Sequence, residues 1–251
     1  MGHPFFSAPR PLVFAHRGGA GLAPENTIAA FDNSRSLGAD GIELDVHLSR
    51  DGCVVVHHDQ TLDRTTRLKG GIAGYSADEL ELANVPALAT VLARYPELRV
   101  IIELKVNSED LARAAIAVVR DAQAGERVCI GSFWTGVVKA VRTQAPELAT
   151  SAAREEVRWA LYRSWCRWPA ARLPYDGFQI PELAGTTRVV SRRFVDDAHR
   201  AGLGVQVWTV DDEPTARRLL GWGVDALISD RPDLILPIVK ADSSSSRSVR
   251  L

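Results

Sequence analysis

The sequence predicts a single (β/α)8 TIM barrel, an α/β fold of eight parallel strands, each followed by a helix. The chain has 251 residues, a common length for one barrel domain. Short apolar runs alternate with helical patterns along most of it. No proline-, glycine- or serine-rich stretch separates a second domain. We therefore expect residues 1–240 to form the barrel domain and residues 241–251, with their four consecutive serines, to form a disordered tail.

Eight apolar runs have the length and composition of buried parallel strands. They cover residues 12–16, 41–47, 100–105, 128–133, 148–152, 177–181, 204–210 and 225–229. Helical patterns lie between most of them, at residues 25–37, 109–122, 135–143, 192–201 and 213–220. Gly38 and Gly221 directly follow two of these patterns, and glycine is a common stop signal for a helix.

One further apolar run, residues 53–59, is too close to the second strand to be a barrel strand. Only residues 49–52 separate the two, and a parallel crossover needs about a dozen residues. With Asp51 and Gly52 as the turn, the runs form an antiparallel hairpin that returns His58 toward the active-site end. Residues 60–96 then form a short insertion before the third strand, with a helix near residues 87–95.

The composition indicates a globular protein without the excess of positive charge that would attract nucleic acid. Hydrophobic residues make up 46% and charged residues 24% of the chain, and the net charge is −1. No run of residues is apolar enough for a membrane span, and residues 1–11 lack the apolar stretch of a signal peptide. The three cysteines are scattered and form no CxxC pair, which favours a reducing compartment. The expected location is the cytoplasm.

Carboxylates gather at the ends of two predicted strands. Because side chains alternate between faces, Glu43 and Asp45 point to the same side of the second strand. Glu103 and Lys105 share a face of the third strand and add another carboxylate near the same rim. Either pair alone is better explained as a solvated strand end or an internal ion pair. Together they favour a metal site, and oxygen ligands favour Mg²⁺, Ca²⁺ or Mn²⁺.

Histidines occur at two other points of the same predicted rim. His16 and Arg17 end the first strand and are followed by two glycines, which let the backbone approach an anion closely. The guanidinium fork suits phosphate oxygens. On the returning hairpin strand, alternation lets only one of His57 and His58 face the site. Phosphodiester cleavage needs one group that takes a proton and one that gives a proton, and two histidines can supply both.

The runs AHRGGAGLAPENTIAAF, GADGIELDVHLSRDGCVVVHHDQTLDRTT, IIELK, VQVWTVDD and GVDALISDRPD occur in this order. Together they resemble the glycerophosphodiester phosphodiesterase family from residue 12 to residue 236. The resemblance implies metal-dependent hydrolysis of small glycerophosphodiesters to sn-glycerol 3-phosphate and an alcohol such as choline or ethanolamine. It implies acid/base roles for His16 and His58, phosphate binding by Arg17 and Lys105, and one Mg²⁺ or Ca²⁺ held by Glu43, Asp45 and Glu103.

Several alternatives stay open at this point. The same residues would serve a lysophospholipase D or a phosphatidylinositol phospholipase C, and a barrel without turnover would bind a lipid or phosphate. The nucleophile is either the neighbouring glycerol hydroxyl, which gives a cyclic phosphate, or water. Phe133 and Trp208 lie at strand ends, where they line the substrate pocket or pack in the core.

Residues 153–175 are rich in tryptophan and arginine. They predict either a helix that touches a membrane surface transiently or a barrel helix whose aromatic side chains pack on the sheet. We favour the second interpretation, because the fold requires a helix at this point. No feature of the sequence fixes an oligomeric state.

Overall fold

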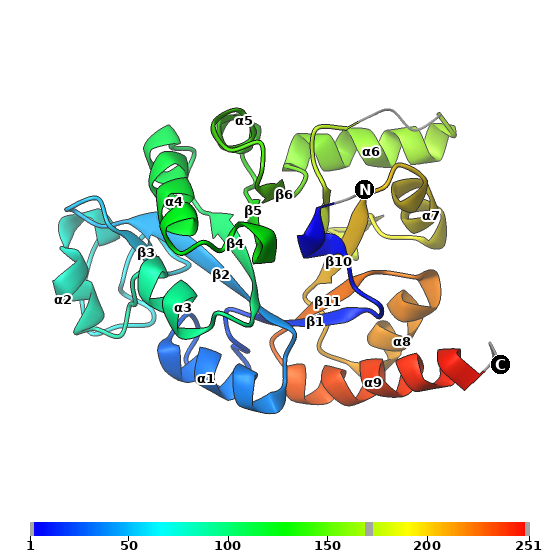
Figure 1. Ribbon diagram of the computed structural model, residues 1–251, viewed down its shortest axis with the longest axis horizontal. Coiled ribbons are helices and arrows are strands. Elements are labelled where there is room, and N and C mark those ends of the chain that lie inside the picture. Colours follow the sequence, from blue (N-terminus) through cyan, green and yellow to red (C-terminus); the bar gives the residue numbers. More distant parts are fainter. Residues whose placement is uncertain (1–2, 169–172, 249–251) are drawn as a thin grey trace.

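The computed structural model describes residues 3–168 and 173–248, the last six of them by backbone alone, and it confirms the (β/α)8 barrel (Figure 1). Eight strands pair side by side in the order β6-β5-β4-β2-β1-β11-β10-β7, and every one of these pairs is parallel. Their bounds are β1 (Leu12–His16), β2 (Gly41–Leu48), β4 (Arg99–Leu104), β5 (Val128–Gly131), β6 (Ala149–Thr150), β7 (Gly177–Pro181), β10 (Gly204–Trp208) and β11 (Ala226–Ser229).

The two ends of this strand order meet and close the barrel. Beyond the short strand β6, Ser151 forms a parallel bridge with Gly177 of β7. Ala152 N donates to Gly177 O at 2.9 Å, and Asp176 N donates to Thr150 O at 2.9 Å. The carboxyl ends of all eight strands therefore face one rim, where barrel enzymes have their active sites.

The predicted hairpin is confirmed. Strand β3 (Val54–Val56) pairs antiparallel with β2, with Val46 opposite Val56. His58, two residues after this strand, lines the cavity at the rim of the barrel. His57 is buried outside that cavity, with its Nε2 3.2 Å from Thr61 O. The insertion after the hairpin contains α2 (Ala77–Glu81) and α3 (Leu88–Arg94), and α3 lies where the sequence predicts a helix.

The remaining helices surround the barrel (Figure 1). They are α1 (Ile28–Leu37), α4 (Glu109–Asp121), α5 (Thr135–Gln144), α6 (Arg154–Cys166), α7 (Arg192–Arg200), α8 (Glu213–Trp222) and α9 (Pro232–Ser248). Short 3-10 turns occur at Pro4–Phe6, Ile72–Gly74 and Gly125–Arg127, and a small hairpin joins β8 (Leu183–Ala184) to β9 (Thr187–Arg188). Among the described helices, none is both long and apolar enough to cross a bilayer.

Three boundaries differ from the prediction. Helix α1 begins at Ile28 rather than residue 25, because the hydroxyl of Thr27 caps it by accepting from Ala30 N. Helix α8 continues through Gly221 and stops at Gly223, whose φ of 88° gives the left-handed end. Residues 241–248, for which the sequence predicts a disordered tail, continue the backbone of α9, and buried apolar residues anchor the start of this helix. Residues 249–251 lie outside the described part.

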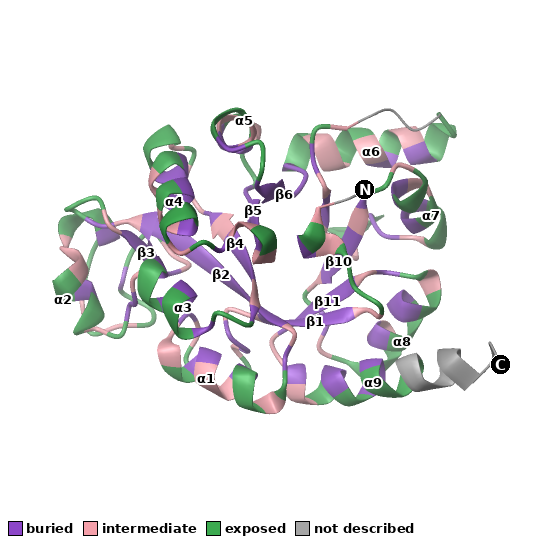
Figure 2. Cartoon of the chain, viewed as in Figure 1, coloured by how far each residue is buried: buried purple, intermediate pink, exposed green. Residues whose placement is uncertain are grey.

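The core explains why the polar residues gather at the rim. On β2, Ile42, Leu44 and Val46 are fully buried beneath the surrounding helices (Figure 2). Each such burial contributes about 1.5–3 kcal/mol, and it fixes the register of the strand. Alternation then turns Glu43 and Asp45 toward the barrel interior.

Candidate active site

A cavity of about 200 Å³ lies inside the carboxyl rim of the barrel. All nine residues that the sequence singled out line it: His16, Arg17, Glu43, Asp45, His58, Glu103, Lys105, Phe133 and Trp208. They come from β1, β2, β4, β10 and the segments that follow β1, β3, β4 and β5. The barrel therefore brings together residues that are far apart along the chain.

Glu43, Asp45 and Glu103 form the acidic centre of this cavity. One carboxylate oxygen from each lies within 4.8 Å of the others, and Glu43 and Asp45 are buried. Burial and then the charge of Asp45 raise the pKa of Glu43 well above its usual range. The pKa of Glu103 is also raised, first by burial and also by Asp45, although Lys105 opposes the shift. Burial therefore disfavours the charged forms of Glu43 and Glu103.

Two cations border the acidic centre. Lys105 Nζ lies 3.3 Å from an oxygen of Asp45 and 3.3 Å from one of Glu103. Arg17 donates its backbone N–H to Glu43 at 3.0 Å, and its Nη1 donates to Glu25 at 3.2 Å. Burial tends to lower the pKa of Lys105, but the two carboxylates outweigh it and raise the pKa. Lys105 therefore stays charged beside the cavity.

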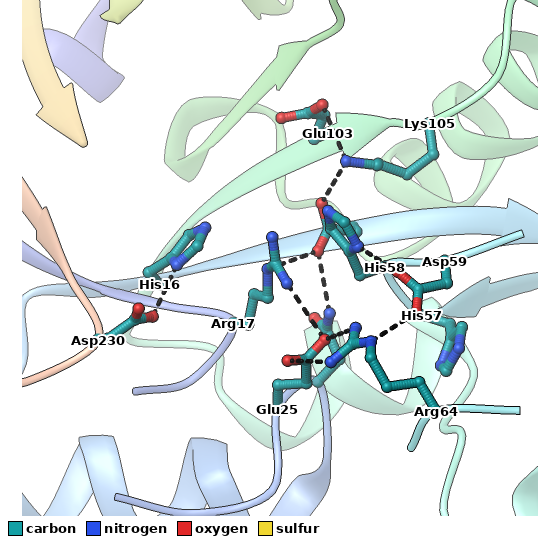
Figure 3. A network of polar contacts seen from close by, with 12 residues as sticks. His16, Arg17, Glu25, His57, His58, Asp59, Arg64, Glu103, Lys105 and Asp230 are labelled. Atoms are coloured by element: carbon teal, nitrogen blue, oxygen red, sulfur yellow. Dashed lines mark hydrogen bonds and ion pairs between the residues drawn. The ribbon is translucent and has the colours of Figure 1, made fainter. Parts of the chain in front are cut away.

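Each of the two histidines holds a carboxylate at Nδ1. His16 Nδ1 lies 2.7 Å from Asp230, and His58 Nδ1 lies 2.6 Å from Asp59. A carboxylate on one ring nitrogen fixes the tautomer and leaves Nε2 for other partners. Burial tends to lower the pKa of His16, but Glu43 and Asp230 together raise it. In Figure 3, Arg17 lies between the two rings.

Arg64 links Asp59, which contacts His58, with Glu25, which contacts Arg17 (Figure 3). Its Nε donates to Asp59 at 2.7 Å, and its two terminal nitrogens donate to Glu25 at 3.0 and 2.6 Å. The hydrogen bond from Arg64, with that from His58, holds the pKa of Asp59 well below its usual range. His58 and Arg17 are thereby linked through Asp59, Arg64 and Glu25.

The other side of the cavity is aromatic. The rings of Phe133 and Trp208 pack edge to face with centroids 6.2 Å apart. Arg154, at the start of α6, places its guanidinium 4.9 Å from the Phe133 ring centroid, and Lys105 Nζ lies 5.9 Å from the same ring. The wall is thus apolar but bordered by positive charge.

Five supporting residues were missed in the sequence as functional positions. Asp230 and Asp59 contact the two histidines, Arg64 contacts Asp59, Glu25 contacts Arg17, and the Asn26 amide donates to Asp45 at 3.0 Å. All five lie inside the runs that carry the family resemblance, at ISDRPD, HHDQTLDRTT and APENT. Their placement in these runs is the signal that could have identified them as functional positions. The other histidines lie outside the cavity: His47 Nε2 lies 3.1 Å from His58 O, and His199 pairs with Asp225 near the surface.

Comparisons with known proteins point to one family. The glycerophosphoryl diester phosphodiesterase family model matches residues 16–234. A glycerophosphodiester phosphodiesterase of Caldanaerobacter subterraneus is 30% identical over 92% of this chain and 98% of its own length. A human lysophospholipase D is 29% identical over 87% of this chain and 81% of its own. A phosphodiesterase of Oleispira antarctica, solved with the product sn-glycerol 3-phosphate, has a TM-score of 0.74 at 27% identity and covers 92% of this chain and 97% of its own.

The fold, the cavity and these likenesses define a barrel enzyme that hydrolyses phosphodiesters. The match of the family model covers most of the chain, and the Caldanaerobacter relative is matched over nearly its full length. The chain belongs to the glycerophosphoryl diester phosphodiesterase family.

Proposed function

We propose that the enzyme hydrolyses glycerophosphodiesters such as glycerophosphocholine and glycerophosphoethanolamine to sn-glycerol 3-phosphate and an alcohol, with the help of one divalent cation. The observation that carries the proposal is that two carboxylate-oriented histidines and three acidic side chains share one small cavity. The product bound to the Oleispira phosphodiesterase supports the choice of substrate.

The residues present fit a hard divalent cation. Glu43, Asp45 and Glu103 offer oxygen ligands within 4.8 Å of one another, which is the donor set that Mg²⁺, Ca²⁺ and Mn²⁺ prefer. Burial raises the pKa of Glu43 and Glu103, and a bound cation would stabilise their charged forms. Such an ion supplies Lewis-acid polarisation of a phosphoryl oxygen and a template for the substrate.

Arg17 and Lys105 bind the phosphate in this scheme. Arg17 Nε lies 3.4 Å from Asp45 Oδ2 in an ion pair and its Nη1 donates to Glu25, so two carboxylates hold the guanidinium at the cavity, where an anion would bind. Its planar fork suits two phosphate oxygens at once. Lys105 adds a point charge next to Asp45 from the segment after β4, which lies on the other side of β2 from β1.

The histidines move the protons. One histidine takes the proton of the glycerol hydroxyl next to the phosphate, and the oxygen of that hydroxyl attacks phosphorus. The other gives a proton to the leaving alcohol as its P–O bond breaks. Water then opens the cyclic phosphate, with the two roles reversed. Asp230 and Asp59 hold the rings so that Nε2 of each faces the substrate. Direct attack by water would use the same two groups in one step.

A second candidate activity is that of a lysophospholipase D, the activity named for the human relative. It uses the same bond cleavage on a substrate that carries an acyl chain. The apolar wall of Phe133 and Trp208 favours it as a side activity, because glycerophosphocholine itself offers no large apolar group to that wall.

The test is release of sn-glycerol 3-phosphate from glycerophosphocholine, first with chelator and then with added Mg²⁺, Ca²⁺ or Mn²⁺. Activity that disappears with chelator and returns with one of the ions supports both the reaction and the cation. Activity that persists in chelator would contradict the cation site. A protein that releases no product from any glycerophosphodiester with any of the three ions would contradict the reaction itself.

A further inference from the structure

Helix α6 lies at the edge of the molecule (Figure 1), and its outer face carries three exposed aromatic side chains. Trp159, Tyr162 and Trp165 are 65%, 48% and 52% exposed, and their spacing of three residues places them on one side of the helix. The sequence favoured packing of these side chains on the sheet, and that prediction is wrong. Leu161 and Val157 take the inward positions of α6 instead.

The three rings contact one another in a row along the helix. The ring centroids of Trp159 and Tyr162 lie 6.4 Å apart, and those of Tyr162 and Trp165 lie 5.6 Å apart, both edge to face. Single exposed apolar residues are common on protein surfaces, but neighbouring ones that form a patch indicate a binding surface. Leaving such a patch in water is unfavourable, so the row of rings points to a partner that covers it.

Arginines without a carboxylate partner lie before and after these rings along the helix. Arg154 and Arg158 are exposed in the first two turns of α6, and Arg167, also exposed, is its C-cap. Within the described part of the chain, none of these three guanidinium groups forms an ion pair. By contrast, the exposed Arg64 and Arg94 both pair with carboxylates. The outer face of α6 therefore combines aromatic rings with uncompensated positive charge.

The acidic residues of α6 do not cancel this charge. Glu156 is half-buried and accepts two hydrogen bonds from Arg142, at 2.6 and 3.0 Å, so this pair is neutral as a unit. Glu155 is exposed at the start of the helix, where it accepts from Thr135 at 3.1 Å. Glu155 can balance one arginine at most. The face keeps an excess of positive charge, which is complementary to an anionic partner.

These residue types favour the surface of an anionic bilayer. Tryptophan and tyrosine prefer the membrane–water interface, because one part of each ring is apolar and another part forms hydrogen bonds. A basic side chain near an anionic lipid surface strengthens binding by about fivefold. Rings that protrude in a row from one helix can enter a soft interface side by side, whereas a protein partner must supply a matching pocket for them.

We propose that the outer face of α6 docks the enzyme reversibly on anionic lipid bilayers. The face consists of Trp159, Tyr162, Trp165, Arg154, Arg158 and Arg167. The rings enter the interface, and the guanidinium groups lie against the lipid phosphates. Among the described helices none can span a bilayer, so this contact is confined to the surface. The docking does not depend on which reaction the cavity catalyses.

The experiment measures sedimentation of the full chain with vesicles in chelator, so that metal ions cannot bridge protein and lipid. Vesicles of phosphatidylcholine alone are compared with equimolar mixtures of phosphatidylcholine and either phosphatidylglycerol or phosphatidylserine. We expect both anionic mixtures to bind at least about tenfold more tightly than phosphatidylcholine, with an affinity that falls as salt is added. Equal binding to all three, or binding to none, would overturn the proposal. A preference for one anionic headgroup of tenfold or more would also overturn it, because a charged face does not distinguish them.

Matched variants assign the binding to α6. Trp159→Ser with Trp165→Ser should weaken binding to anionic vesicles at least about tenfold, because at least half of each side chain is available for burial. Arg158→Glu should weaken it at least about fivefold. The controls are Leu82→Ser and Arg67→Glu, which change exposed residues of the insertion and should bind like wild type. Helix α2, next to Leu82, lies at the opposite end of the molecule from α6 (Figure 1). Control variants that lose as much affinity as the α6 variants would contradict the role of this face.

Two further measurements identify the partner. Vesicles with brominated acyl chains should quench the tryptophan fluorescence of the wild type, and the double serine variant should lose most of this quenching. Analytical ultracentrifugation without lipid tests a second copy of the chain as the partner, and we expect a monomer. A dimer that the double variant dissociates, together with no vesicle binding, would replace the lipid surface by self-association. Urea denaturation should be the same for all variants, which shows that binding and not folding has changed.

Discussion

Arg64 provides the sharpest test of how the site is held together. It donates to Asp59, which orients His58, and to Glu25, which contacts Arg17. Replacing it with methionine keeps much of the apolar stem and removes every one of these donors. We expect Arg64→Met to lower kcat, because His58 loses its orientation, and to raise KM, because Arg17 loses its anchor.

The expected loss in kcat/KM follows from the exposed fractions of the three side chains that form the two ion pairs. Arg64 is 50% exposed, whereas the side chains of Glu25 and Asp59 are 15% and 28% exposed. Each pair is therefore expected near the upper end of the roughly 0.2–1 kcal/mol measured for accessible ion pairs. Two pairs give about 1–2 kcal/mol, which corresponds to a loss of about 5- to 30-fold in kcat/KM.

The pH profile adds a readout that a merely structural role would not move. Arg64 is the largest cause of the lowered pKa of Asp59, so the carboxylate stays ionised as the pH falls. Without Arg64, the pKa of Asp59 rises toward its ordinary value, and the acid limb of the rate profile should move to higher pH. Arg64→Lys should recover little of the loss, because one ammonium cannot reproduce the fork that reaches both carboxylates.

A matched control is Arg120→Met. Arg120 is also 50% exposed, and it makes two hydrogen bonds to Glu147 on a distant part of the surface. Urea denaturation of both variants separates a loss of stability from a loss of rate. A kcat/KM of Arg64→Met within about twofold of wild type, or an Arg120→Met variant that is equally impaired, would refute the role of Arg64.

Three further predictions concern the cavity itself. His16→Ala or His58→Ala should lower kcat by about 100-fold or more while cation binding, followed by calorimetry, persists; a near-normal rate for either contradicts acid/base catalysis. In chelator, the raised pKa of Glu43 means that its contribution to stability is present at low pH and is lost as pH rises above about 4.5, so added Mg²⁺ should raise the melting temperature more near pH 8 than near pH 5; an equal rise at both would contradict this. Gly131→Ala places a Cβ 2.6 Å from Ser151 Oγ in the cavity wall, so it should destabilise the fold by about 1–3 kcal/mol in urea denaturation; an unchanged free energy of unfolding would contradict the close approach.

The fold could be predicted because its signals are local. Buried parallel strands produce continuous apolar runs, and the short turn after β2 excludes a crossover, so strand number and hairpin follow from neighbouring residues. Strand ends were less accurate: the run at 148–152 contains only Ala149–Thr150 as a strand. Composition could not reveal that the serine-rich end continues α9, because the helix is anchored by buried apolar residues in its first turns and not by the serines themselves.

Residues of the site could be predicted where a strand carries them and could not where the contact depends on barrel closure. Glu43 and Asp45 share a face by alternation alone. Asp230 reaches His16 across 214 positions, because β11 pairs with β1 when the barrel closes. Arg64 reaches Glu25 across 39 positions, from the insertion to the segment before α1. No local pattern marks either partner, although both lie in runs that carry the family resemblance.

The two halves of the barrel contribute different chemistry to the cavity. The charged groups from His16 to Lys105 come from β1 to β4 and the segments beside them, whereas Phe133, Ala152 and Trp208 come from β5 onward. The cavity therefore has a charged side, built from the first half of the barrel, and a less polar side, built from the second. Motifs lie in both halves, and Asp230 of the second half contacts His16 of the first. An apolar wall can be built from many side chains, so its extent becomes visible only in the structure, where α6, β7 and the small hairpin enclose an apolar hollow of about 530 Å³ beside the cavity.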